Sequence, residues 1–218
     1  MGRGRDEIQQ LLESIAAMAD DAGNLLRTAS EAFLRCDMEA LPKIRSAERA
    51  LNRQENANDA RCLRILALYQ PEADDLRGVL MALKINNDLE RIGDHALNVA
   101  ERAEQVGTFP SASSTDMFRR MSDVCLAMLS DAITAFVARD TALAKTVIRR
   151  DDEVDELLQR AISDVLSERW SERAQRQTAI ALVFAAKEFE RIADLCTNVA
   201  EDVVFMAEGT SLKHLGKV

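Results

Sequence analysis

The sequence contains few of the residues that interrupt helices. Only 3 prolines and 8 glycines occur in 218 residues, and both types are unfavourable inside an α-helix. Aromatic side chains make up only 4% of the chain, whereas alanine, leucine, arginine and the acidic residues are abundant. This composition is typical of an all-α protein, and the length suits one large domain or two small ones.

Histidine and cysteine are also scarce, which restricts the available chemistry. Two histidines leave little material for imidazole metal sites or for histidine-based catalysis. The 4 cysteines have no Cys-x-x-Cys spacing, and each stands among apolar residues, where a free thiol behaves as a small apolar side chain. A reduced, cytoplasmic compartment fits this pattern best.

The chain also lacks a long apolar run and an excess of positive charge. The longest unbroken apolar run, Ala179 to Ala186, is far too short to cross a bilayer. No apolar segment follows the basic residues of the N-terminus, so we expect no signal peptide. The formal net charge of −9 argues against nucleic-acid binding and favours cations or basic protein surfaces as partners.

One stretch of twelve residues occurs twice, as ERIGDHALNVAE at 90–101 and as ERIADLCTNVAE at 190–201. The two copies share Glu, Asp, Asn and Glu at offsets of 0, 4, 8 and 11. On a helix these offsets lie along one face, while the shared isoleucine and valine point elsewhere and can pack. We therefore expect each copy to be a helix with a buried side and a stripe of oxygen atoms.

The oxygen stripe brings like charges together. Two pairs are spaced four residues apart, Glu90 with Asp94 and Glu190 with Asp194. Each pair costs a helix roughly 0.2–0.5 kcal/mol unless something offsets the repulsion. A bound cation is one candidate, and Arg91 and Arg191, each three residues before an aspartate, are the other. Helix geometry alone leaves both readings open.

The predicted second helix of each half adds further oxygen atoms, from Asp151 and Asp155 in one half and from Glu48 and Asn52 in the other. Carboxylates from two neighbouring helices would form a cluster of hard oxygen ligands. Such a set suits Fe(III), Mn(II), Mg(II) or Ca(II). The alternative is an acidic surface helix whose charges pair with Arg149 and Arg150.

Hydrophobic periodicity predicts that a whole three-helix unit is repeated. A shift of 103 residues matches the first part of each unit, and a shift of 100 matches the last helices. The units span 6–107 and 116–208, separated by a loop of glycine, proline, serine and threonine, and 209–218 is expected to be a loose tail. Asp37 and Ser171 are expected to cap the helices that follow them.

A ferritin-like di-iron enzyme is an alternative bundle that binds metal through carboxylates. That class needs a Glu-x-x-His sequence on two helices, and neither His95 nor His214 has a glutamate three residues earlier. The sequence therefore argues against it. We expect His95 to lie on the surface, with metal ligation as the alternative.

Two segments of the sequence resemble the PhoU family. They are LALYQPEADDLR at 66–77 and INNDLERIGDHALNVAE at 85–101, and the repeated Glu-x-x-x-Asp spacing accompanies them. The resemblance covers nearly the whole chain. It implies an all-α fold of two similar antiparallel three-helix bundles side by side, and a protein that is not an enzyme.

The function implied by the resemblance is negative regulation of phosphate uptake and of phosphate-starvation signalling. Such a protein acts in the cytoplasm as an adaptor between the ATPase subunit of a phosphate ABC transporter and a sensor histidine kinase. It reaches the membrane only peripherally, through these partners, and a homodimer is an open expectation. Two alternatives remain: a cytoplasmic domain of a sodium–phosphate cotransporter, or a metal-free helical docking module.

The resemblance also implies metal ions held by the Glu-x-x-x-Asp residues and by their partners on the second helices. Iron is the leading candidate, with zinc, manganese or magnesium as alternatives. The matching positions are Glu90, Asp94, Glu190, Asp194, Asp151, Asp155 and Glu48. Asn52 departs from the acid usual in the family, so the site in the first half is expected to be weaker. Four further residues also match the family. They could orient the ligands or pack between helices as readily as bind the metal directly: Asn98, Asn198, Glu101 and Glu201.

Overall fold

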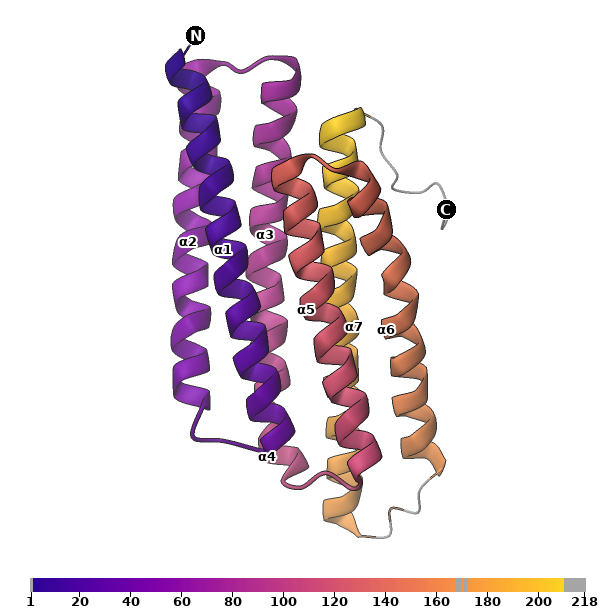
Figure 1. Cartoon of the computed structure of the whole chain (residues 1–218). Helices are drawn as coiled ribbons and strands as arrows, with labels where there is room; N and C mark the ends of the chain where they lie inside the picture. Colours follow the sequence, from indigo (N-terminus) through magenta and orange to yellow (C-terminus); the bar gives the residue numbers. More distant parts are fainter. Residues whose placement is uncertain (1, 168–169, 171, 210–218) are drawn as a thin grey trace.

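The computed structural model describes residues 2–167, 170 and 172–209, and within them helices are the only regular secondary structure (Figure 1). The elements are α1 (Gly2–Arg35), α2 (Leu41–Tyr69), α3 (Ala73–Glu101), the short α4 (Ala103–Val106), α5 (Ala112–Ala138), α6 (Thr141–Ser167) and α7 (Arg173–Glu208). The predicted all-α class is confirmed. The predicted tail beyond Gly209 lies outside the described residues.

The long helices form two antiparallel bundles side by side, α1–α3 and α5–α7 (Figure 1). Helices α3 and α7 pack against each other in the centre, α1 packs on α5, and α2 and α6 are the outermost helices. One continuous apolar core runs through both bundles. The predicted pair of three-helix bundles is therefore confirmed, while their proposed boundaries stay a prediction.

The scarce aromatic residues are concentrated where the two bundles meet. Phe33 of α1, Phe109 of the connecting loop and Phe118 of α5 pack edge to face, with ring centroids 5.2–5.9 Å apart. Aromatic pairs prefer this geometry and gain free energy beyond their burial. The cluster ties the loop between the halves to α1 and α5.

The helix caps differ in part from the predictions. Asp37 does not cap α2, because three residues of turn separate it from Leu41 and its carboxylate accepts from the backbone of Glu39. Asp140, its counterpart, does cap α6 by accepting from two backbone N–H groups. Ser171 lies outside the described residues, and α7 begins instead with a capping box at Glu172.

Helix α5 is long and apolar enough to cross a membrane by length and composition alone. No long unbroken apolar run marks this helix in the sequence, because polar residues interrupt it. Its buried side faces α1, α6 and α7, and a core helix has the same composition.

Candidate metal centres

Each copy of the repeated stretch has one buried side and one oxygen-bearing side, as expected. On α3, Ile92 and Val99 are fully buried, whereas Asp94 is exposed and Glu90 half-buried. On α7, the equivalent isoleucine and valine are likewise buried, with Asp194 exposed. The 3.6-residue period explains this division, because offsets 2 and 9 point away from offsets 0 and 4.

Helix α2 brings two further carboxylates to the first Glu-x-x-x-Asp pair. The pKa of Glu90 is raised to about 6, first by burial and then by the charges of Asp94, Glu55 and Glu48, in that order. The approach of the two helices is close, because Gly93 leaves room for Leu51 of α2. The first cluster therefore contains Glu48, Glu55, Glu90 and Asp94.

Asn52 belongs to the first cluster through its amide. Its Nδ2 donates to Oε1 of Glu48 at 2.5 Å. Its Oδ1 is buried and has no hydrogen-bond partner among the described residues. A buried carbonyl oxygen without a donor is costly unless a donor or a cation satisfies it.

Glu55 is a member of the cluster that the sequence analysis missed. It lies three residues after Asn52 and seven after Glu48, which places all three on the same side of α2. Asn86 of α3 donates to the main-chain oxygen of Glu55 at 2.9 Å, so this turn of α2 lies against α3. The spacing from Glu48 was the available signal. The equivalent residue of α6, Leu158, is buried and apolar.

The second cluster lies between α6 and α7. Partial burial of its carboxylate raises the pKa of Asp194, and the nearby charges of Glu190 and Asp155 raise it further, whereas Lys187 and Arg191 lower it. Lys187 donates to Glu190 at 2.8 Å. The predicted residues Glu190, Asp194 and Asp155 are thus close enough to influence one another.

Asp151 is directed more towards the interior of the second bundle. Burial raises the pKa of Cys125 and of Cys196, and the negative charge of Asp151 raises both further. Both thiols are fully buried, so they are held protonated and unreactive.

The arginines do not form the ion pairs that the alternative reading predicted. Arg91 lies 3.7 Å from Asp88, and among the described residues neither Arg91 nor Arg191 is ion-paired with the aspartate three residues later. Both arginines still act at longer range, because they lower the pKa of Glu90 and of Asp194 respectively.

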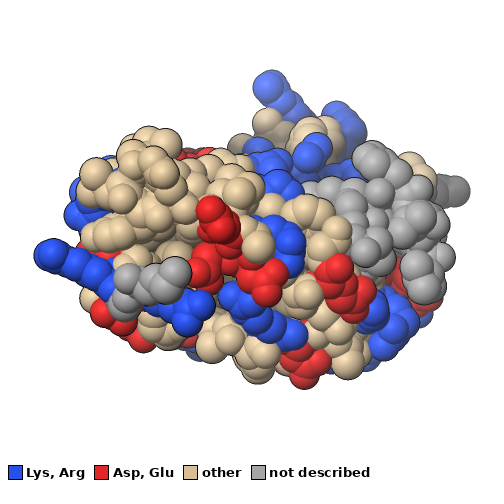
Figure 2. Space-filling model, turned by 90° about the horizontal axis from the view of Figure 1, so that it is seen from above, with Lys and Arg blue, Asp and Glu red and all other residues tan. Residues whose placement is uncertain are grey.

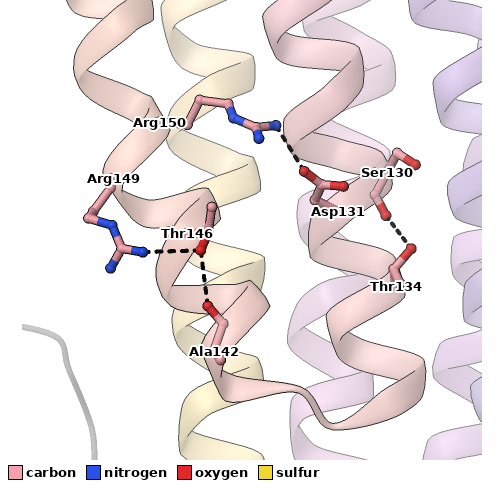
Figure 3. A network of polar contacts seen from close by, with 7 residues as sticks. All are labelled: Ser130, Asp131, Thr134, Ala142, Thr146, Arg149 and Arg150. Atoms are coloured by element: carbon pink, nitrogen blue, oxygen red, sulfur yellow. Dashed lines mark hydrogen bonds and ion pairs between the residues drawn. The ribbon is translucent and has the colours of Figure 1, made fainter.

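The arginines beside Asp151 also turn to other groups (Figure 3). Arg150 crosses from α6 to α5 and pairs with Asp131 at 2.8 Å, and Arg149 donates to the hydroxyl of Thr146 at 3.1 Å.

The donor set fits a hard cation in chemistry, though the side chains do not yet converge. Carboxylate and amide oxygens suit Mg(II), Mn(II), Ca(II) or Fe(III), and the orphaned Oδ1 of Asn52 fits the same class. Within the described part of the chain, no three His, Cys, Asp or Glu side chains are arranged to hold a metal ion. Binding would therefore require these side chains to turn towards a common point.

His95 is not a surface residue, contrary to the expectation. Its Nδ1 lies 2.7 Å from Oε2 of Glu188, both side chains are more than four-fifths buried, and Asn98 donates to the same oxygen at 3.2 Å. Burial alone would raise the pKa of Glu188, but hydrogen bonds from His95 and Asn98 and the charges of His95 and Arg102 hold it below its ordinary value. The sequence could not reveal this contact, because α3 and α7 are far apart in the chain.

Two further oxygen-stripe residues have structural roles. Asn98 joins α3 to α7 through Glu188, and Glu101 pairs with Arg45 of α2 at 3.0 Å. In the first half, the stripe is therefore divided between the carboxylate cluster and contacts that fix neighbouring helices.

Comparison with known proteins gives a consistent result. The PhoU domain model matches residues 15–103 and again 118–203. The chain is 35% identical over 208 residues to the phosphate-specific transport system accessory protein PhoU homolog of Aquifex aeolicus, covering 95% of this chain and 94% of that protein. The homolog from Deinococcus radiodurans is 31% identical, with 94% and 96% covered.

Solved structures agree with the arrangement of the helices. The crystal structure of PhoU from Pseudomonas aeruginosa matches with a TM-score of 0.88 at 29% identity, over 94% of this chain and 99% of that one. PhoU from Streptococcus pneumoniae matches with the same TM-score at 23% identity over 96% of this chain and 99% of that one, which supports the fold alone. Because the family model covers both halves, the chain belongs to the PhoU domain family.

Proposed function

We propose that this protein is a negative regulator of phosphate uptake and of phosphate-starvation signalling. It acts in the cytoplasm as a metal-binding adaptor between the ATPase subunit of a phosphate ABC transporter and a sensor histidine kinase. Its relatives are named accessory proteins of a phosphate-specific transport system, which supports a role beside a transporter. The pair of carboxylate clusters carries the metal-binding part of the proposal.

Electrostatic repulsion within the clusters favours cation binding. Glu90 and Asp94 face Glu48 and Glu55, and the pKa of Glu90 is raised to about 6, first by its burial and then by these charges. A cation that binds there supplies positive charge, which offsets the repulsion and stabilises the ionised carboxylates. Iron is the leading candidate, and zinc, manganese and magnesium are the others.

Residues from two helices would hold each ion. Glu90, Asp94, Glu48 and Glu55, with Oδ1 of Asn52, would hold it between α2 and α3. Glu190, Asp194, Asp155 and Asp151 would hold it between α6 and α7. Each site would then tie an outer helix to a central one and stiffen the face that meets a partner, so metal content should control partner binding.

The metal is tested by elemental analysis of protein purified without chelator or metal-affinity tag. We expect at least one equivalent in the native protein, and less in the variants Glu90→Gln/Asp94→Asn and Glu190→Gln/Asp194→Asn. The control is Asp20→Asn/Asp123→Asn, which removes two exposed acids from α1 and α5 and should leave metal content unchanged. Equal metal in all four proteins, or none after addition of iron or manganese, would contradict the proposal.

The adaptor role is tested by direct binding to the purified transporter ATPase subunit and to the kinase. We expect binding of both partners to weaken when chelator removes the metal and in the two cluster variants. Binding that is equally tight with and without metal would leave the acidic stripes as a metal-free docking face. Sedimentation of the same samples shows whether the protein forms a homodimer.

A further inference from the structure

A second polar site lies in the groove between α3 and α7, outside the carboxylate clusters. It is a cavity of about 390 Å³, lined chiefly by Lys84, Asn87, Asp88, Arg91, Asn198 and Asp202. None of these residues belongs to the proposed metal ligands.

The cavity offers several hydrogen-bond donors that the protein does not use. Arg91 lies 3.7 Å from Asp88, beyond hydrogen-bond distance, so the guanidinium keeps its donors for another partner. Asn87 and Asn198 line the same cavity, and each side-chain amide has two N–H donors. Lys84 donates one hydrogen bond, at 2.7 Å, to Asp202 and has two further N–H groups.

The repeat supplies an internal comparison, because the equivalent place on the other side of the α3–α7 pair is closed. There the residue equivalent to Lys84 is Phe184, whose ring lies under the Arg102 guanidinium at 5.3 Å. Glu188, the equivalent of Asp88, is hydrogen-bonded to His95 and Asn98. The two equivalent places between α3 and α7 therefore differ. Side chains of the protein fill the one at Phe184 and Glu188, whereas the one at Lys84 and Asp88 is an open cavity with several hydrogen-bond donors.

The cavity also contains acceptors, which narrows the class of ligand. The carboxylates of Asp88 and Asp202 are largely buried at its wall, and a carboxylate has about four lone-pair sites. A ligand that fits must accept from Arg91, Asn87 and Lys84 and also offer a hydroxyl group to Asp88. An oxyanion that keeps a proton at neutral pH has both properties.

We propose that this cavity binds inorganic phosphate. Near neutral pH, phosphate keeps at least one O–H group, which donates to Asp88, while its other oxygens accept from Arg91 and the neighbouring donors. Sulfate has the same shape but no proton at this pH, so Asp88 would repel it. The site does not depend on the metal clusters and would let the protein respond to phosphate directly.

Binding is measured by calorimetry with inorganic phosphate, in chelator so that no metal ion holds the anion. We expect saturable binding to the native protein, and a dissociation constant raised about tenfold or more in Arg91→Gln, which loses the planar donor group. The matched control is Arg191→Gln, the equivalent arginine on the closed side, which should bind within about twofold of the native protein. Circular dichroism confirms that each variant is folded.

Four results would overturn the proposal. The first three are no heat of binding at millimolar phosphate, equal weakening in both arginine variants, and sulfate binding as tight as phosphate. A small phosphate monoester in a separate titration distinguishes free from esterified phosphate. Tighter binding of the ester would overturn the assignment to inorganic phosphate. Because chelator is present throughout, loss of metal binding cannot produce any of these results.

Discussion

Glu90 is the residue in which the electrostatic cost of the first cluster is clearest. Burial and, after it, three nearby carboxylates together raise its pKa from an ordinary value of 4.5 to about 6. The folded protein therefore binds a proton at this site more tightly than the unfolded chain does. Below pH 4.5 Glu90 is protonated in both states, and its unfavourable ionisation in the fold sets in as the pH rises through about 6.

We expect the substitution Glu90→Gln to remove part of the pH dependence of stability in the metal-free protein. Because the side chain is partly exposed, screening reduces the effect to about 1 kcal/mol. Relative to the native protein, the variant should therefore gain about 1 kcal/mol in free energy of unfolding between pH 4.5 and pH 7. Urea unfolding in chelator at both pH values measures this difference.

The control for this substitution is Glu190→Gln in the second cluster. Glu190 accepts a hydrogen bond from Lys187 at 2.8 Å, so its removal loses an attraction as well as a repulsion. If only Glu90→Gln gains free energy of unfolding between pH 4.5 and pH 7, the raised pKa of Glu90 is supported. An unchanged pH dependence in that variant would show that the fold does not raise the pKa of Glu90.

At the scale of helices, the contact between the second and third helix is packed by different residues in the two bundles. Gly93 of α3 faces Leu51 of α2, whereas the equivalent residues in the second bundle are Ala193 and Val154. A Cβ atom at Gly93 would clash with Cδ2 of Leu51. The smaller residue on one helix thus accompanies the larger residue on its neighbour.

We expect Gly93→Ala to lower the free energy of unfolding by about 1–2 kcal/mol. Overpacking against Leu51 costs about 1–3 kcal/mol, and the better helix propensity of alanine returns up to about 1 kcal/mol. The double variant Gly93→Ala/Leu51→Val copies the second bundle and should recover much of the loss. Denaturant unfolding of the single and double variants tests this coupling.

Gly23 provides the matched control within the same bundle. A Cβ atom there would make only an ordinary contact, 3.8 Å from Leu129. Gly23→Ala should therefore stabilise the protein by up to about 1 kcal/mol through helix propensity. If both glycine variants changed stability in the same direction, the close contact with Leu51 would not be the cause.

Helix register in the first bundle is also fixed by a buried polar network. Asn86 of α3 is fully buried and donates to Asp59, and its own oxygen accepts from Asn58. Asn58 in turn accepts from Ser14 of α1 at 2.6 Å. A network whose members are hydrogen-bonded specifies one alignment of three helices. The equivalent of Asn86 in the second bundle is Ala186, so this device belongs to the first bundle alone.

At the scale of the whole molecule, α3 and α7 hold the halves together through polar contacts beside the continuous core. His95 and Glu188 form one of them, and Lys84 and Asp202 form another at 2.7 Å. The two contacts lie at different heights along the α3–α7 pair, and their order along the two helices shows that these helices are antiparallel. Relative movement of the bundles would have to break both.

The described residues at the end of the molecule that carries the N-terminus form no separate acidic patch in the view of Figure 2. Figure 2 shows acidic and basic side chains interspersed on that end. Arg5 lies 3.9 Å from Asp75 there, and Arg77 pairs with Asp74. Such exposed pairs add little stability.

We expect Glu188→Gln and His95→Ala each to destabilise the folded protein, with a coupling of about 1–2 kcal/mol in a double-mutant cycle. The pKa of Glu188 is lowered by its hydrogen bonds from His95 and Asn98, against the effect of burial. Its contribution to stability is therefore present above its ordinary pKa of 4.5 and is lost as the pH falls through the lowered value. Unfolding at pH 7 and at pH 3 measures both effects.

Additive effects of the two substitutions would contradict a direct contact. A Glu188→Gln variant that is equally destabilised at both pH values would show that charge plays no part in it. Circular dichroism of each variant distinguishes loss of the contact from loss of the helices.

The sequence by itself determined the helical class, the repeat, the buried side of each repeated stretch and the members of each Glu-x-x-x-Asp pair. These properties are local, because a helix fixes which residues at spacings of three and four share a face. They needed no knowledge of what lies across from that face. The same local rules left open whether arginines or a cation offset the paired carboxylates.

Only the tertiary structure decided which residues meet across helices. It placed Glu55 beside Glu90, paired His95 with Glu188, and opened the cavity beside Arg91 on one side of the α3–α7 pair. These contacts depend on the distance and rotation of antiparallel helices, which are set by pairs of residues far apart in the chain, such as Gly93 and Leu51. Periodicity within one helix carries no information about them, because it is the same whatever the neighbouring helix presents.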